Sequence, residues 1–138
     1  MYFFCFFILL LSFGIDKWLS IIGAIAIALS SYFIVIIAAG HNTKTASIAL
    51  ISVVVGGFYL IFRKKYGIGF VLAMIFTAAG FSCHPQMTYY LFMMIGLMWL
   101  AELAIHIKEH SIKDFCLSTA TFALSITIGL GTGCSNIL

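Results

Sequence analysis

The chain has 138 residues, of which 64% are hydrophobic and only 8% are charged, and its formal net charge is +3. A soluble domain carries about a quarter charged residues, so this composition excludes an ordinary globule in water and indicates a chain surrounded mostly by lipid. The small net charge also gives no reason to expect a nucleic-acid partner.

Polar breaks divide the chain into six apolar segments. A helix needs about 17–25 apolar residues to cross a bilayer, because about 30 Å of hydrocarbon must be crossed at about 1.5 Å per residue. We therefore expect a single all-α domain, residues 1–138, folded as a polytopic transmembrane helical bundle with short hairpin loops. In chain order, the predicted spans are residues 1–15, 18–39, 46–62, 66–82, 87–107 and 113–133.

The first segment, residues 1–15, is the weakest of the six. It lacks the basic start and the small-residue cleavage site of a secretory signal, so we interpret it as a retained membrane segment. A helix of this length reaches only about 22 Å. If it lies in the membrane interface instead, the number of predicted spans falls to five.

Side chains at the breaks predict where helices begin. Asp16 precedes the second segment and Thr45 precedes the third. Both residue types cap helix N-termini, so we expect these two side chains to do so. Pro85 suits the first turn of the fifth helix. Ser111 and Asp114 have the S-x-x-D spacing of a capping box before the sixth. Such tight connections make consecutive helices antiparallel.

The basic residues give the expected orientation. If the spans alternate in direction, six of the seven lysine and arginine residues fall on one side of the membrane, and Lys44 is the exception. Because short cytoplasmic loops are rich in lysine and arginine, we expect both termini on the non-cytoplasmic side of a bacterial inner (plasma) membrane or an equivalent organelle membrane. The six are Lys17, Arg63, Lys64, Lys65, Lys108 and Lys113.

Four ionisable residues gather at the end of the fifth segment, in the stretch AELAIHIKEH. Glu102, His106, Glu109 and His110 fall within an arc of about 100° on a helix, so the sequence predicts one stripe. Glu102 lies about 8 Å inside the segment by helical rise. A charged group near a bilayer's centre costs about 3 kcal/mol, so we expect Glu102 to be protonated, paired or facing a wet cavity.

Two interpretations of this stripe remain open. In the first, the histidines complement the dipole at the helix C-terminus and Glu102 forms an i,i+4 pair with His106. In the second, the stripe relays a proton or a cation, because histidine exchanges protons near neutral pH. A transition-metal site on His106 and His110, with Glu102 or Glu109 as a third ligand, is a weak alternative. We expect no metal and no cofactor.

Cysteines and histidines fall near the opposite side of the predicted bundle. Cys83 and Cys134 are the natural disulfide pair if that compartment is oxidising. With His41 and His84 they are also weak candidates for copper or zinc ligands, but no ligand spacing supports such a site. We favour the interpretation that these cysteines act as small hydrophobic residues.

The sixth segment carries a polar face. In lipid, small and hydroxyl-bearing residues usually let helices approach one another and form hydrogen bonds, so packing is the first interpretation. The alternative is a polar passage that this face shares with Glu102. The face consists of Ser118, Thr121, Ser125 and Thr132.

No motif predicts catalysis. The sequence has no informative nucleophile–base pair, phosphate-binding loop or dinucleotide fingerprint, so we do not expect an enzyme. The expected function is that of a subunit or accessory component of a larger membrane assembly, with membrane lipids and other integral membrane subunits, or further copies of the chain, as partners. The alternative is a small oligomeric proton- or cation-coupled transporter or channel that uses Glu102 and His106.

Overall fold

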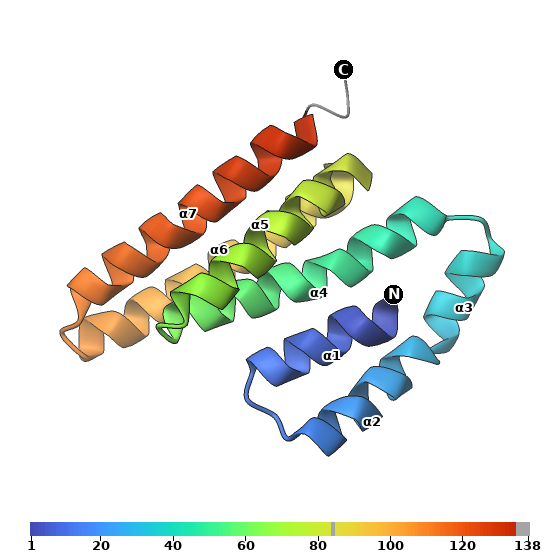
Figure 1. Cartoon of the computed structure of the whole chain (residues 1–138), viewed down its shortest axis with the longest axis horizontal. Coiled ribbons are helices and arrows are strands. Elements are labelled where there is room, and N and C mark those ends of the chain that lie inside the picture. Colours follow the sequence, from blue (N-terminus) through green and yellow to red (C-terminus); the bar gives the residue numbers. More distant parts are fainter. Residues whose placement is uncertain (84, 135–138) are drawn as a thin grey trace.

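The computed structural model describes residues 1–83 and 85–134, with the side chains of all of these except residues 80–83, 85, 133 and 134. Throughout this part of the chain the regular elements are helices, so the predicted all-α class is confirmed (Figure 1). The helices are α1 (Tyr2–Ser12), α2 (Lys17–Ala28), α3 (Ser31–Ala38), α4 (Asn42–Phe62), α5 (Tyr66–Cys83), α6 (Pro85–Lys108) and α7 (Ile112–Cys134).

Within the described residues, three helices are long and apolar enough to cross a membrane. These are α4, α6 and α7, and α2 with α3 makes a fourth if this bent pair is one span. Helix α1 and the part of α5 with described side chains, Tyr66–Ala79, are apolar but shorter. The helices follow the six predicted segments, yet six spans are not confirmed.

The segment predicted at 18–39 is broken rather than straight. Helices α2 and α3 meet at an angle of 42°. Ser30, between them, has an extended backbone (φ −58°, ψ 133°) and stands at the N-cap of α3, followed by Ser31. Serine favours the N-cap conformation, and paired small polar residues are a common cause of sharp helix kinks.

One predicted helix start is confirmed and another is wrong. The side chain of Asp16 accepts a hydrogen bond from the backbone N–H of Trp18 at 3.1 Å and so caps α2. Thr45 does not cap the third segment, because α4 begins three residues earlier, at Asn42. The Thr45 hydroxyl instead donates to the carbonyl oxygen of His41 at 2.6 Å, one turn back.

The predicted capping box before α7 does not form. The helix begins at Ile112, directly after Ser111, as the sequence indicated. However, Ser111 Oγ is buried without a hydrogen-bond partner in the described structure. The other member of the box, Asp114, binds Lys64 at the end of α4, with 2.7 Å between Oδ2 and Nζ. The carboxylate that local spacing assigned to the cap therefore pairs with a lysine in the turn between α4 and α5.

Four helices end in the same kind of reversing turn. Gly14, Gly40, Lys64 and His110 have positive φ values of 78°, 81°, 66° and 53°. In each turn the next backbone N–H bonds a carbonyl five residues earlier, as from Ser111 to His106 at 3.1 Å. This is the Schellman arrangement, which satisfies end carbonyls and stops the helix sharply. It reverses the chain between α4 and α5 and again between α6 and α7, so that the two helices of each pair run in opposite directions (Figure 1).

Helix α4 lies at the centre of the bundle, where it contacts α1, α3, α5, α6 and α7. Of its most apolar 18-residue stretch, 72% is buried. Val53, Val54, Phe58 and Ile61 on this helix are at most 1% exposed and form the middle of the core. By contrast, α2 packs mainly on α1, and α3 buries none of its residues.

Two neighbouring glycines let α4 touch helices on two sides. A Cβ at Gly57 would lie 2.9 Å from the backbone oxygen of Gly69 on α5, and a Cβ at Gly56 would lie 2.9 Å from Ser12 Oγ on α1. Real Cβ atoms are not found this close to other atoms. The contact at Gly57 therefore requires glycine, because it is made with backbone, whereas a side chain at Gly56 would require the Ser12 hydroxyl to shift. Small residues at membrane helix interfaces permit this approach of backbones.

Gly57→Ala should therefore separate α4 from α5. Overpacking of a close interior contact typically costs about 1–3 kcal/mol, and here the obstructing atoms are backbone atoms that cannot rotate away. Thermal unfolding of the purified protein in detergent, with and without the substitution, measures the loss.

Gly96→Ala in α6 is the matched control, because nothing lies within 4 Å of a Cβ at that position. Alanine is the better helix former by up to about 1 kcal/mol, so this change should leave stability unchanged or raise it. Equal effects of the two substitutions would contradict the close packing of α4 and α5.

Candidate functional site

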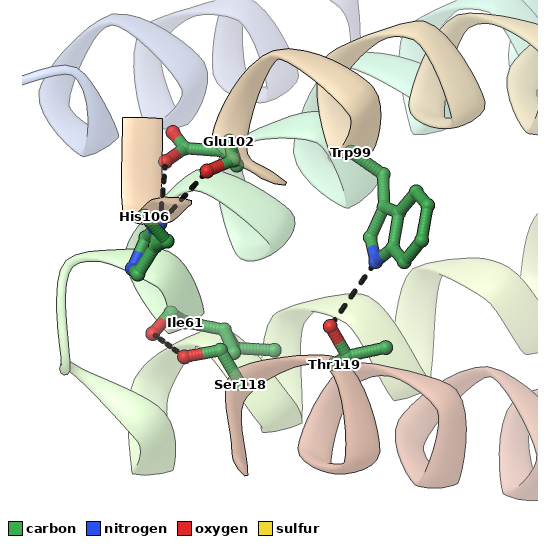
Figure 2. Close-up of polar contacts among 6 residues, drawn as sticks. All are labelled: Ile61, Trp99, Glu102, His106, Ser118 and Thr119. Atoms are coloured by element: carbon green, nitrogen blue, oxygen red, sulfur yellow. Dashed lines mark hydrogen bonds and ion pairs between the residues drawn. The ribbon is translucent and has the colours of Figure 1, made fainter. Parts of the chain in front are cut away.

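Glu102 and His106 form the most buried ionisable pair described in the bundle. Both lie on α6 one turn apart, with 3.8 Å between His106 Nδ1 and Glu102 Oε2. Their side chains are only 13% and 10% exposed, respectively. Figure 2 shows the carboxylate and the imidazole turned toward each other on the inner face of the helix. The carboxylate that the sequence placed inside the segment is thus paired, as the i,i+4 spacing allowed.

The hydrogen bond of the imidazole indicates which of its two nitrogens carries the hydrogen. His106 Nδ1 lies 2.9 Å from the backbone carbonyl oxygen of Glu102, and the carboxylate approaches the same nitrogen (Figure 2). A carbonyl oxygen can only accept, so Nδ1 carries the hydrogen and donates it.

Two aromatic rings pack against His106. Its ring centroid is 6.1 Å from that of Phe62, at the end of α4, and 5.6 Å from that of Phe115, in the first turn of α7. Trp99, on the same face of α6, packs on Phe115 at 5.2 Å. These rings exclude water from one side of the pair, which strengthens the interaction between carboxylate and imidazole in a low-dielectric environment.

The predicted four-residue stripe does not continue past this pair. Helix α6 ends at Lys108, and His110 has the left-handed backbone conformation that closes it, with φ 53°. Glu109 and His110 are exposed. The structure therefore brings together Glu102 and His106, and it leaves the other two residues of the stripe on the surface.

A second ion pair lies at the same end of the bundle. Lys64 Nζ and Asp114 Oδ2 are 2.7 Å apart and join the α4–α5 turn to the start of α7. The hydrogen bond to Asp114, and then its charge, raise the pKa of Lys64 above the ordinary value of 10.5. While Asp114 is ionised, the contribution of the Lys64 charge to folding is thus complete below that pH, and it is lost as the pH rises through the higher folded pKa. Because both side chains are well exposed, this contribution is small.

The predicted polar face of α7 divides into inward and outward residues. Ser118 and Ser125 are at most 1% exposed. Ser118 Oγ makes a long hydrogen bond of 3.5 Å to the Ile61 carbonyl oxygen on α4, whereas Ser125 bonds its own helix at Phe122. Thr121 and Thr132 also bond carbonyl oxygens of α7. These hydrogen bonds satisfy the four hydroxyls within α7 or against α4, as helix packing requires.

Other candidate ligands are spread out or lie outside the described side chains. Cys83 and Cys134 end α5 and α7, but their side chains are not among those described, and His84 lies outside the described residues. His41 is exposed at the start of α4. Among the described residues, no three His, Cys, Asp or Glu side chains gather closely enough to hold a metal ion.

Sequence reasoning missed one polar contact next to the pair. The indole N–H of Trp99 on α6 donates to Thr119 Oγ1 on α7 at 3.1 Å (Figure 2). Trp99 stands three residues before Glu102 and seven before His106, so all three share a helix face. That spacing was visible in the sequence, but the partner on α7 was not, because it depends on how the two helices pack.

Comparison with protein-family models, curated proteins and solved structures found no match to this chain.

The geometry therefore shows a buried carboxylate–imidazole pair beside two aromatic rings. His106→Ala removes the partner of Glu102 and the ring that packs on Phe62 and Phe115. A buried polar group left unpaired typically costs about 1–3 kcal/mol, so unfolding in detergent should become easier by about this amount.

His110→Ala serves as the matched control, since His110 is exposed just beyond the same helix. Surface substitutions usually stay within about 0.5 kcal/mol. A loss for His110→Ala as large as that for His106→Ala would contradict the pairing.

Proposed function

We propose that the chain is an integral membrane protein that acts as a subunit or accessory component of a larger membrane assembly. Its composition, with 64% hydrophobic residues, and its three to four long apolar helices support a lipid environment. In lipid, backbone polar groups must be satisfied within the chain, and helices do so. We further propose that the remaining apolar helices complete a bundle of six spans, the bent α2–α3 pair counting as one.

We propose an orientation with the basic turns on the cytoplasmic side and both termini opposite, in a bacterial inner membrane or an equivalent organelle membrane. Two features support it. The end of α4 and the start of α7 meet through Lys64 and Asp114, so these two turns share one end of the bundle. Lys44 lies near the start of α4, about 30 Å away by helical rise. This separation fits the positive-inside rule.

The observation that carries the subunit proposal is the exposure of α6. Only 17% of the most apolar stretch of this 24-residue helix is buried, against 72% for α4. Its outward residues include Tyr89, Met93, Leu97 and Leu100, each at least 50% exposed. Gly96 is also exposed, and nothing lies within 4 Å of a Cβ built there. Large apolar side chains beside a small residue suit the close approach of a helix from another subunit.

A photo-crosslinking amino acid at Leu97 tests this proposal. In native membranes it should join the chain to one other integral membrane protein, and that protein should co-purify in mild detergent in a constant ratio. The same amino acid at Ile95, which is only 6% exposed on the inner face of α6, is the control and should react within the chain. Recovery of a pure homo-oligomer, crosslinked at Leu97 only to itself or to lipid, would contradict the proposal.

A second candidate function, proton- or cation-coupled transport by an oligomer, is favoured by the Glu102–His106 pair. A buried carboxylate and histidine near the end of a membrane helix are typical of proton-handling sites. The middle of the core, including Val53, Val54 and Phe58, is apolar and buried. An oligomer would therefore have to supply the rest of any path between its copies.

Glu102→Gln distinguishes the two candidates. The amide keeps the shape of the side chain but cannot ionise, so a relay should lose its pH-dependent ion flux in proteoliposomes, down to the level of empty vesicles. Glu109→Gln, on the exposed turn after the same helix, should keep the flux. If wild-type vesicles carry no flux, or if Glu102→Gln keeps it, the relay is excluded and the subunit proposal is unaffected.

A further inference from the structure

A small cavity lies between α4, α5 and α6, away from the Glu102–His106 pair. The space open to the centre of a water-sized sphere is about 10 Å³, which is the lower limit for holding one water molecule. Three hydroxyl-bearing residues line it, one from each helix: Ser47, Thr77 and Thr88. The rest of the lining is apolar and consists of Leu50, Ile51, Val54, Phe76, Met87 and Leu91.

Thr77 is the cavity residue whose hydroxyl lacks a hydrogen-bond partner among the described residues. It is 2% exposed, and its Oγ1 has no hydrogen-bond partner in the described structure. Other threonine hydroxyls in these helices donate to the carbonyl oxygen one turn back, as those of Thr45, Thr121 and Thr127 do. A buried hydroxyl without a partner loses its hydrogen bonds to water and forms none within the protein, which destabilises the folded state.

Packing restricts how far Thr77 can move to find a partner. The backbone of α7 at Gly129 lies so close that a Cβ there would be 3.0 Å from Thr77 Cβ. Ser47 is 2% exposed, and its hydroxyl hydrogen already goes to the Thr43 carbonyl oxygen at 3.1 Å. Ser47 Oγ therefore remains available only as an acceptor.

We propose that this cavity binds one water molecule, which accepts from Thr77 Oγ1 and donates to Ser47 Oγ, with the Thr88 hydroxyl as a third partner. Buried waters typically make about three hydrogen bonds, and each of the three hydroxyls here comes from a different helix. The water thereby ties the first turns of α6 to α4 and α5. Thr88 and Glu102 are about 21 Å apart by helical rise along α6, so this site is independent of the proposed function.

Solid-state NMR of the wild-type chain in lipid bilayers, labelled at threonine, tests the site directly. Magnetisation transferred from water protons should reach Thr77. Thr119 is the control, because its hydroxyl accepts from the Trp99 indole and its position does not line the cavity. A signal at Thr77 no stronger than at Thr119 would overturn the proposal.

Thr77→Val gives a second, independent measurement. Valine has nearly the same shape, so in a hydrated cavity it removes a partner of the water and should lower the unfolding midpoint below that of the wild type. In a dry cavity it would remove an unsatisfied hydroxyl, and a midpoint at or above the wild-type value would count against the water. Thr127→Val, exposed on α7, is the matched control. The NMR measurement decides the question if Thr77→Val does not fold.

Discussion

Helices α4 and α5 touch backbone to backbone at Gly57 and Gly69, and much of the bundle is arranged around this contact. Gly56 faces the other way, toward Ser12 on α1. The two adjacent glycines therefore let α4 pack closely between α1 and α5. Helix α7 makes a similar close contact with α5 at Gly129, where a Cβ would lie 2.7 Å from the Met74 carbonyl oxygen. Close van der Waals packing of this kind is what holds helices together in bundles that lie in lipid, where apolar surface alone does not drive association.

Helix α6 is held differently, by polar and aromatic contacts on one face. Trp99 bonds Thr119 across to α7, and His106 lies against Phe62 and Phe115 beside its partner Glu102. The remainder of the helix is largely uncovered. An interior with a low dielectric makes such polar contacts strong when every group is satisfied and costly when one is not. The same physics explains why the buried carboxylate of Glu102 lies beside His106, and why the buried hydroxyl of Thr77 needs a hydrogen-bond partner.

Much of the fold and part of the site could be predicted because they depend on neighbours in sequence. Polar breaks located the helices, Asp16 located the start of α2, and the i,i+4 spacing paired Glu102 with His106. The errors share a different origin. Asp114 was assigned to a cap but binds Lys64, and the stripe through Glu109 and His110 is cut by the turn that ends α6. In each case a competing contact or a turn replaced the regular local pattern.

The amino-acid sequence by itself determined the helical class of this protein and the presence of helices apolar enough to cross a membrane, because composition and hydrophobic run length act before any tertiary contact exists. Only the tertiary structure decided which of α7's hydroxyls face inward, which helix is central and which is left uncovered. It also decided that Ser47, Thr77 and Thr88, far apart in the sequence, line one cavity. Those outcomes depend on how closely backbones approach, and that distance is set by pairs of residues on different helices rather than by either residue alone.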